Sequence, residues 1–111
     1  MNPIEIAAAL QRLAQVGQLS HEELAQRTGK DRSTVTNLLR LLRLPSEVRA
    51  LVAEMRLSMG HARALLALPD EESQRKLALR AAERGLSVRE VERLVREATE
   101  PPKPKPEREI D

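Results

Sequence analysis

The chain has 111 residues, a formal net charge of +2 and a hydrophobic fraction of 41%, and it contains no aromatic residue and no cysteine. This length predicts a single domain, and a core limited to Leu, Ala, Val, Ile and Met favours helix-on-helix packing over a sandwich of sheets. The composition excludes a disulfide framework and a thiolate metal site, and because no apolar run could span a membrane and no secretory signal is visible, we expect a cytoplasmic protein.

The first predicted helix begins with a capping box in which Asn2 is the N-cap, Pro3 takes the first helical position and Glu5 closes the box. Gly17 is expected to end this helix in the left-handed conformation. The apolar stripe that should face the core consists of Ile6, Leu10, Leu13 and Ala14.

Two further helices are predicted on either side of a tight turn at Gly29. The first of them opens with a second capping box, formed by Ser20 and Glu23. Asp31 is expected to cap the next helix, which should run to about Arg43. The residues expected to be buried on the helix before the turn are Leu24 and Ala25.

Four more helices are predicted after a break at Leu44-Pro45, ending near residues 54, 67, 85 and 99. Their expected N-caps are Ser46, Ser58, Asp70 and Ser87, the last in a box with Glu90. Their expected inward-facing residues are Val48, Leu51 and Val52, then Met59, Ala62, Leu65 and Leu66, then Leu77, Leu79 and Ala81, and finally Val88, Val91, Leu94 and Val95.

The predicted fold class is therefore all-α, a compact bundle of about seven short helices that contains a helix-turn-helix. No strand-like alternation of apolar and polar residues is visible. Residues 1–99 are expected to form the domain that contains the helix-turn-helix. Residues 100–111 are expected to form a charged linker or tail, because four prolines within six residues fit neither a helix nor a central strand.

The helix-turn-helix prediction depends on four positions. A small residue is needed where the second helix crosses the first, a residue tolerant of positive φ is needed in the turn, and branched apolar residues are needed where the second helix packs back. The residues that meet these needs are Ala25, Gly29, Val35 and Leu38. The apolar stripe of the second helix, at spacing i, i+3, i+4, i+7, is Val35, Leu38, Leu39 and Leu42.

The opposite face of that helix predicts contact with DNA. It carries Ser33, Thr36, Asn37 and Arg40 at the same spacing. Ser, Thr and Asn are poor helix formers, whereas a merely solvated face would usually be Glu and Lys. We expect Thr36, Asn37 and Arg40 to read base edges in the major groove. Phosphate contacts are expected from Lys30, Arg32, Ser33, Thr34 and Arg43, although Thr34 equally fits a residue that points into solvent.

A second candidate contact is the segment Ser58–Arg63, where Gly60 and His61 lie in the first turn of a helix. A small residue there lets a phosphate approach closely, so Ser58, Gly60, His61 and Arg63 are candidate DNA contacts. The alternative is that Gly60 makes room for a neighbouring helix and His61 is a polar surface residue. The residue chemistry alone leaves the two alternatives open.

No catalytic site is expected. Ser20 and His61 have no acidic partner at a meaningful spacing, and there is no glycine-rich phosphate loop. The two histidines lie far apart, so no metal site is predicted. The paired acids Glu22–Glu23 and Glu71–Glu72 lie in the first turns of helices, where the helix dipole explains them.

Three stretches, HEELAQRTGKDRSTVTNLLRLLRLP, LSMGHARALLAL and GLSVREVERLV, occur in this order after the opening NPIEIAAALQRL. Together they resemble the central domain of the ParB/Spo0J family of chromosome- and plasmid-partition proteins. The resemblance covers Asn2 to Val95. It implies sequence-specific binding of a palindromic centromere-like site, parS, by residues 32–43, with Ser58–Arg63 also close to the DNA. Asp31 departs from the Ser expected at that cap.

The resemblance also implies partners and limits. Two copies would pair on the palindrome, in a cytoplasmic, nucleoid-associated protein. The family's CTP-binding motifs and its C-terminal dimerisation domain are not found in this sequence, so we expect a middle segment with no CTPase activity and no cofactor of its own. CTP with Mg²⁺ and a ParA-type ATPase would be partners of the full-length protein only. The alternatives are a helix-turn-helix regulator of an unrelated operator and a helical protein-interaction module.

Overall fold

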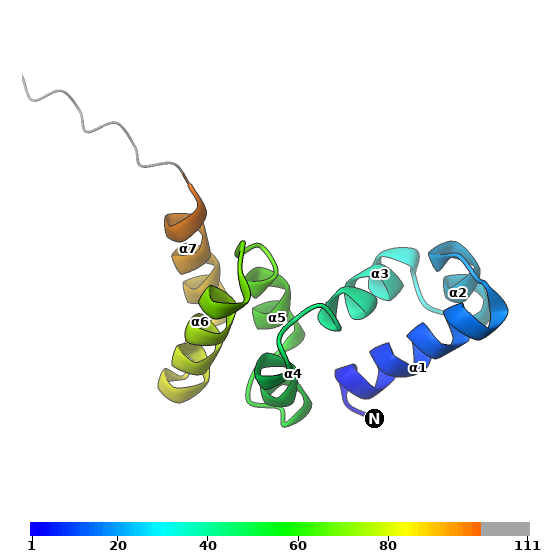
Figure 1. Cartoon of the computed structure of the whole chain (residues 1–111), viewed down its shortest axis with the longest axis horizontal. Helices are drawn as coiled ribbons and strands as arrows, with labels where there is room; N and C mark the ends of the chain where they lie inside the picture. Colours follow the sequence, from blue (N-terminus) through cyan, green and yellow to red (C-terminus); the bar gives the residue numbers. More distant parts are fainter. Residues whose placement is uncertain (101–111) are drawn as a thin grey trace, which may run out of the picture.

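The structure is a computed structural model that describes residues 1–100, and within this part of the chain it contains seven α-helices and no strand. The helices are α1 (Pro3–Gly17), α2 (His21–Thr28), α3 (Arg32–Leu41), α4 (Ser46–Ala53), α5 (Met59–Leu65), α6 (Glu71–Arg84) and α7 (Val88–Thr99) (Figure 1). The predicted fold class and helix order are confirmed. The predicted tail lies outside the described residues except for Glu100. None of the described helices is long and apolar enough to cross a membrane.

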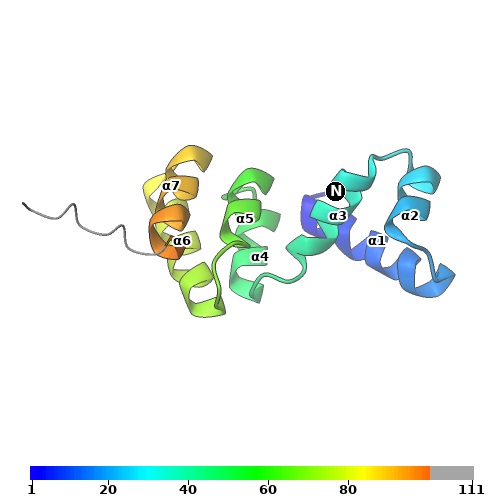
Figure 2. The ribbon, with the colours of Figure 1, turned by 90° about the horizontal axis from the view of Figure 1, so that it is seen from above.

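The helices form two groups along the long axis of the molecule. At one end, α1 and α2 pack against α3, and at the other end α6 and α7 pack against α5 (Figures 1 and 2). The two groups are joined because α4 contacts α1, α5 and α6, while α3 also contacts α5. The helix-turn-helix formed by α2 and α3 therefore lies away from α6 and α7.

One large hydrophobic core runs through both groups. Its helical members include Ala7 and Leu10 on α1, Leu38 and Leu41 on α3, and Val91 on α7, all buried. The connections between helices contribute as well: the core residues that lie between helices are Leu44, Leu57 and Leu68, each at most 5% exposed. Burying side chains of this size stabilises the fold by roughly 1.5–3 kcal/mol each, so these connections are part of the core.

A second, smaller core lies inside the helix-turn-helix and consists of Leu24, Ala25 and Val35. Partly buried residues packed against it include Leu39, which also packs against the large core. Because α3 places Val35 in the small core and Leu38 in the large one, the helix-turn-helix cannot rotate independently of the rest of the domain.

The predicted capping boxes are confirmed. The boxes Asn2–Glu5, Ser20–Glu23 and Ser87–Glu90 each pair both side chains with backbone N–H groups, and Asp70 accepts a hydrogen bond from the Ser73 N–H. Asp31 occupies the N-cap of α3 as predicted, but its side chain accepts no capping hydrogen bond. One predicted cap was wrong, because the N-cap of α4 is Pro45 and not Ser46. The hydroxyl of Ser46 instead donates to Glu47 Oε1 at 3.0 Å.

Two leucines predicted to face inward are exposed. Leu13 is 50% exposed and Leu79 is 45% exposed. The buried face of α1 runs through Ala7 and Leu10, and that of α6 runs through Gln74, Ala78 and Ala81. Leu79 follows Ala78 directly, and one residue turns a helix by about 100°, which carries its side chain off the buried face. On α1 the half-buried Ala14 continues the buried face, and Leu13 precedes it by one residue, so the Leu13 side chain also points off that face.

Two helices end earlier than predicted. α3 stops at Leu41 and α5 at Leu65, two residues short in each case. After Leu41 the chain continues in tighter turns, in which the N–H of Arg43 donates to the carbonyl of Arg40 and the N–H of Leu44 to that of Leu41. Such bonds three residues apart tighten the last turn and bring Leu44 into the core.

The end of α1 also differs from the prediction. Gly17 is the last helical residue, and the left-handed conformation falls on Gln18, with φ of 51°. A Cβ atom at Gly17 would lie 3.1 Å from Leu19 Cγ. Glycine at position 17 therefore relieves a tight contact with the Leu19 side chain, and Gln18 takes the left-handed position one residue later.

The strain at Gln18 leads to a prediction. Gln18→Gly should raise the free energy of unfolding by about 0.5–1 kcal/mol, because glycine adopts positive φ without a steric cost and the replaced side chain is exposed. Gln15→Gly, an exposed change inside α1, should lower it by about 1 kcal/mol. Urea denaturation of both variants checks this. A loss of stability in Gln18→Gly equal to that in Gln15→Gly would contradict it.

Candidate nucleic-acid interface

The turn between α2 and α3 has the geometry of a helix-turn-helix. Gly29 adopts φ of 72°, and nothing lies within 4 Å of where its Cβ would be. Glycine is therefore favoured there by the backbone conformation and not by crowding. The N–H of Lys30 donates to the carbonyl of Ala25 at 3.1 Å, which closes the end of α2. Ala25, Val35 and Leu38 are buried, as predicted from their spacing.

The polar face of α3 points away from both cores. Ser33 and Arg40 are exposed, while Thr36 and Asn37 are half-buried. The neighbouring candidates take positions around them: Lys30 precedes α3, Arg32 and Thr34 are in its first turn, and Arg43 follows its end. Every candidate of this first group therefore lies on α3 or directly beside it.

His21 completes this surface, although it was not among the residues predicted to contact DNA. Its Nδ1 lies 3.0 Å from Thr36 Oγ1, so the first residue of α2 contacts the polar face of α3. The sequence contained one indication of this contact. The Ser20–Glu23 box places His21 at the start of α2, and in a helix-turn-helix the start of the first helix lies near the middle of the second.

A groove of about 550 Å³ lies between α1, α2 and α3. It brings three of the predicted residues together, Thr36, Arg40 and Arg43, and adds His21. Gln11 and Gln15 line its α1 side. The groove therefore gathers cationic side chains and hydrogen-bonding groups from three helices, a combination that suits a phosphate backbone next to base edges.

The electrostatics of this surface favour an anion. The ion pairs found within residues 1–100 join Glu47 to Arg75, Glu72 to Lys76 and Glu97 to Arg93, and none of them uses a basic residue of α3. The first N–H groups of α3 donate no hydrogen bond to the side chain of Asp31 at its N-cap. Free N–H groups at a helix start, beside Arg32, form a favourable position for a phosphate.

At the start of α2 the electrostatics are different. The backbone N–H of Ser20 donates to Glu23, and this hydrogen bond, followed by that of the Ser20 hydroxyl, holds the pKa of Glu23 below its usual range. At neutral pH the Glu23 carboxylate therefore stays hydrogen-bonded in the capping box. Its negative charge there offsets the positive end of the helix dipole. The α2 start is anchored by this box, and His21 is held beside α3.

The second candidate segment, Ser58–Arg63, makes several of its contacts within the protein itself. Ser58 is exposed and caps α5, and Arg63 is exposed. A Cβ atom at Gly60 would lie 3.0 Å from Val88 Cγ2, so Gly60 admits α7. This contact favours the alternative in which Gly60 makes room for a neighbouring helix.

Both ring nitrogens of His61 are occupied. Its Nδ1 accepts a hydrogen bond from the Ser58 N–H at 3.0 Å, and its Nε2 lies 2.7 Å from the carbonyl oxygen of Leu86. Because a carbonyl only accepts, Nε2 carries the proton and donates it. His61 thus caps α5 and ties it to the connection between α6 and α7. DNA contacts by Gly60 and His61 stay predictions.

Comparisons with known proteins all point to the same family. Residues 1–100 match the family model described as the ParB HTH domain. A probable chromosome-partitioning protein ParB of Neisseria meningitidis is 50% identical over 108 residues, which are 97% of this chain and 37% of that protein. The chromosome-partitioning protein ParB of Myxococcus xanthus is 49% identical over 98 residues, 88% of this chain and 33% of that protein. The chain spans about a third of the length of these relatives.

Two solved structures are similar in fold. The C-terminally truncated chromosome-partitioning protein ParB from Caulobacter crescentus, complexed to the centromeric parS site, superposes with a TM-score of 0.78 at 41% identity and covers 87% of this chain and 50% of that one. A DNA-binding domain of a chromosome-partitioning protein ParB, also complexed to parS, has a TM-score of 0.77 at 40% identity and covers 99% of this chain and 86% of that one.

The two histidines should respond differently to substitution. His61→Ala removes the donor to Leu86 and leaves that carbonyl without its partner, so the free energy of unfolding should fall by about 1–3 kcal/mol. His21→Ala, at an exposed position of α2, should change it by no more than about 0.5 kcal/mol. Chemical denaturation of both variants measures the difference. A fully stable His61→Ala variant that binds DNA more weakly would instead place His61 at the DNA.

Proposed function

Because the chain belongs to the ParB HTH domain family, we propose that it binds a palindromic centromere-like DNA site, parS, in chromosome or plasmid segregation. The polar face of α3, with Thr36, Asn37 and Arg40 on the side opposite the cores, carries this proposal. Support comes from the two similar ParB structures, which are complexes with parS. Residues 1–99 are the DNA-binding domain in this proposal.

The side chains of α3 divide into two roles. Thr36, Asn37 and Arg40 read base edges in the major groove, where a good bidentate contact contributes roughly 1–3 kcal/mol of discrimination. Lys30 and Arg43 contact the phosphate backbone on either side. His21 holds the Thr36 hydroxyl through the 3.0 Å contact. Because this contact already fixes the Thr36 side chain, less side-chain entropy is lost when Thr36 binds DNA.

The start of α3 and the start of α5 complete the interface in this proposal. Arg32, Ser33, Thr34 and the free N–H groups of α3 take one phosphate. Ser58 and Arg63 on α5 provide a second contact with the DNA backbone, held in place because His61 ties α5 to Leu86. The exposed Arg63 guanidinium suits a phosphate better than a base.

Two copies of the chain pair on the palindrome, one on each half-site, as the symmetry of such a site requires. Binding of this kind places the protein at the nucleoid. CTP hydrolysis and contact with a ParA-type ATPase are expected of full-length members of the family, and we propose neither activity for this chain alone.

Sequence preference tests the proposal. The chain should bind a duplex with a parS palindrome at least about tenfold more tightly than one with two base pairs changed in each half-site, since each mismatch costs about 1–3 kcal/mol. Affinity should fall steeply between low and moderate salt, because phosphate contacts release counterions. Fluorescence anisotropy measures both effects.

The same experiment separates the alternatives. Equal affinity for both duplexes would contradict the proposal. Selection of an unrelated site from a random pool would indicate a regulator of another operator. Undetectable or salt-independent binding would indicate a protein-interaction module.

A pair of arginine variants tests whether the polar face of α3 binds the DNA. Arg40→Ala should weaken binding to the parS duplex by roughly 1–3 kcal/mol and reduce the preference over the altered duplex, because Arg40 is assigned to a base edge. Arg96→Ala removes an equally exposed arginine from the last turn of α7 and should leave binding unchanged. Titration of each variant with both duplexes provides the comparison. A larger loss from Arg96→Ala would show that the protein binds DNA through its other end.

A further inference from the structure

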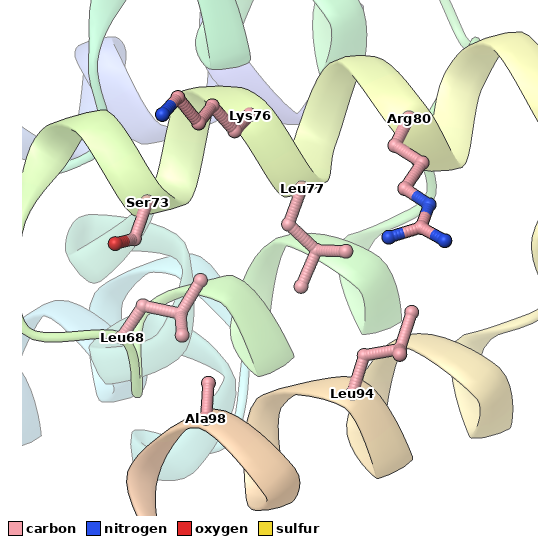
Figure 3. A pocket seen from close by; sticks show the side chains of 7 residues that line it. All are labelled: Leu68, Ser73, Lys76, Leu77, Arg80, Leu94 and Ala98. Atoms are coloured by element: carbon pink, nitrogen blue, oxygen red, sulfur yellow. The ribbon is translucent and has the colours of Figure 1, made fainter.

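α6 and α7 follow one another in the chain but are not closely packed against each other. Each packs against α5, whereas the contact between α6 and α7 themselves is marginal. A groove of about 300 Å³ opens between them. Figure 3 shows Leu77 of α6 pointing into this space, with Leu94 and Ala98 of α7 across from it. Leu68, from the connection before α6, lines one end of the groove, near Ser73 and Ala98.

The groove is apolar because each helix is covered on one face only, α7 by α5 and α6 by α4 and α5. On α7 the residues that are fully covered are Val91 and Val95, while Leu94 is half-buried and Ala98 is exposed. On α6 the covered residues are Gln74, Ala78 and Ala81, while Leu77 is half-buried. Two apolar flanks therefore face one another across an open gap, an arrangement that a third helix can fill by packing into both.

One cation marks the edge of the groove. The guanidinium of Arg80 extends from α6 toward the α7 side in Figure 3, and no ion pair within residues 1–100 involves it. The other cation of the lining, Lys76, already has a carboxylate partner, since its Nζ lies 3.4 Å from Glu72 Oε1. The groove thus offers an apolar floor and a single unmatched positive charge, which is complementary to an aliphatic side chain next to a carboxylate.

We propose that the groove between α6 and α7 is a docking site for an acidic amphipathic helix of a partner protein. Aliphatic side chains of the partner, at helical spacing, insert between Leu77 and Leu94, and a carboxylate pairs with Arg80. The groove lies at the end of the molecule opposite α2 (Figures 1 and 2). The proposal does not depend on DNA binding, and its test uses no DNA.

The test is a nuclear magnetic resonance titration of the full chain with a synthetic helical peptide. The peptide has Leu at i, i+3, i+4 and i+7 and Glu elsewhere, and a matched peptide has Lys in place of every Glu. The acidic peptide should shift the methyl signals of Leu77, Leu94 and Ala98, and the Lys peptide should bind at least about threefold more weakly. Arg80→Glu should reduce affinity for the acidic peptide by a similar factor.

Control variants make the outcome decisive. Arg84→Glu changes an exposed arginine one turn further along α6, outside the groove, and should leave peptide affinity nearly unchanged. Ala98→Glu, at an exposed position of the lining, should weaken binding of the acidic peptide without unfolding the chain. Equal binding of the two peptides, shifts confined to other surfaces, or no shift at millimolar peptide would overturn the proposal. Concentration-dependent shifts of the groove without peptide would overturn it in favour of a second copy of the chain.

Discussion

The orientation of α3 depends on the burial of its apolar side in two different cores. Val35 completes the small core of the helix-turn-helix, while Leu38 and Leu41 enter the large core, and Leu39 packs against both. A rotation of α3 would expose leucine in one core and overpack the other, and each error costs a few kcal/mol. The polar face carrying Arg40 is therefore held outward by apolar packing, and the direction in which this face points does not depend on its own polar residues.

The two histidines illustrate how position decides the role of the same side chain. His21 follows an N-cap at the exposed start of α2, and one ring nitrogen contacts Thr36 on the polar face of α3. His61 occupies the third position of α5 and closes a capping box with Ser58, a place usually taken by Glu or Gln. An imidazole there has a second nitrogen, which donates to Leu86. His61 therefore links the N-cap of α5 to the connection that precedes α7.

Features set by neighbours in the chain were predictable, and those set by distant contacts were not. The capping boxes, the turn at Gly29 and the burial of Ala25, Val35 and Leu38 follow from spacings of a few residues. The hydrogen bond from His61 joins residues 25 positions apart, and the burial of Leu44, Leu57 and Leu68 depends on how the helices meet. The end of α1 was also not predictable from residue type, because Gln18 and not Gly17 adopts positive φ.

The contacts that hold α7 also account for the open groove beside it. Gly60 lets Val88 approach α5, and His61 holds the Leu86 carbonyl, so the start of α7 is tied to the start of α5. α6 is held by α4 as well as by α5, and Arg75 Nε lies 3.5 Å from Glu47 Oε2 of α4. The two helices therefore have different anchors, and Leu77 and Leu94 lie at the groove between them.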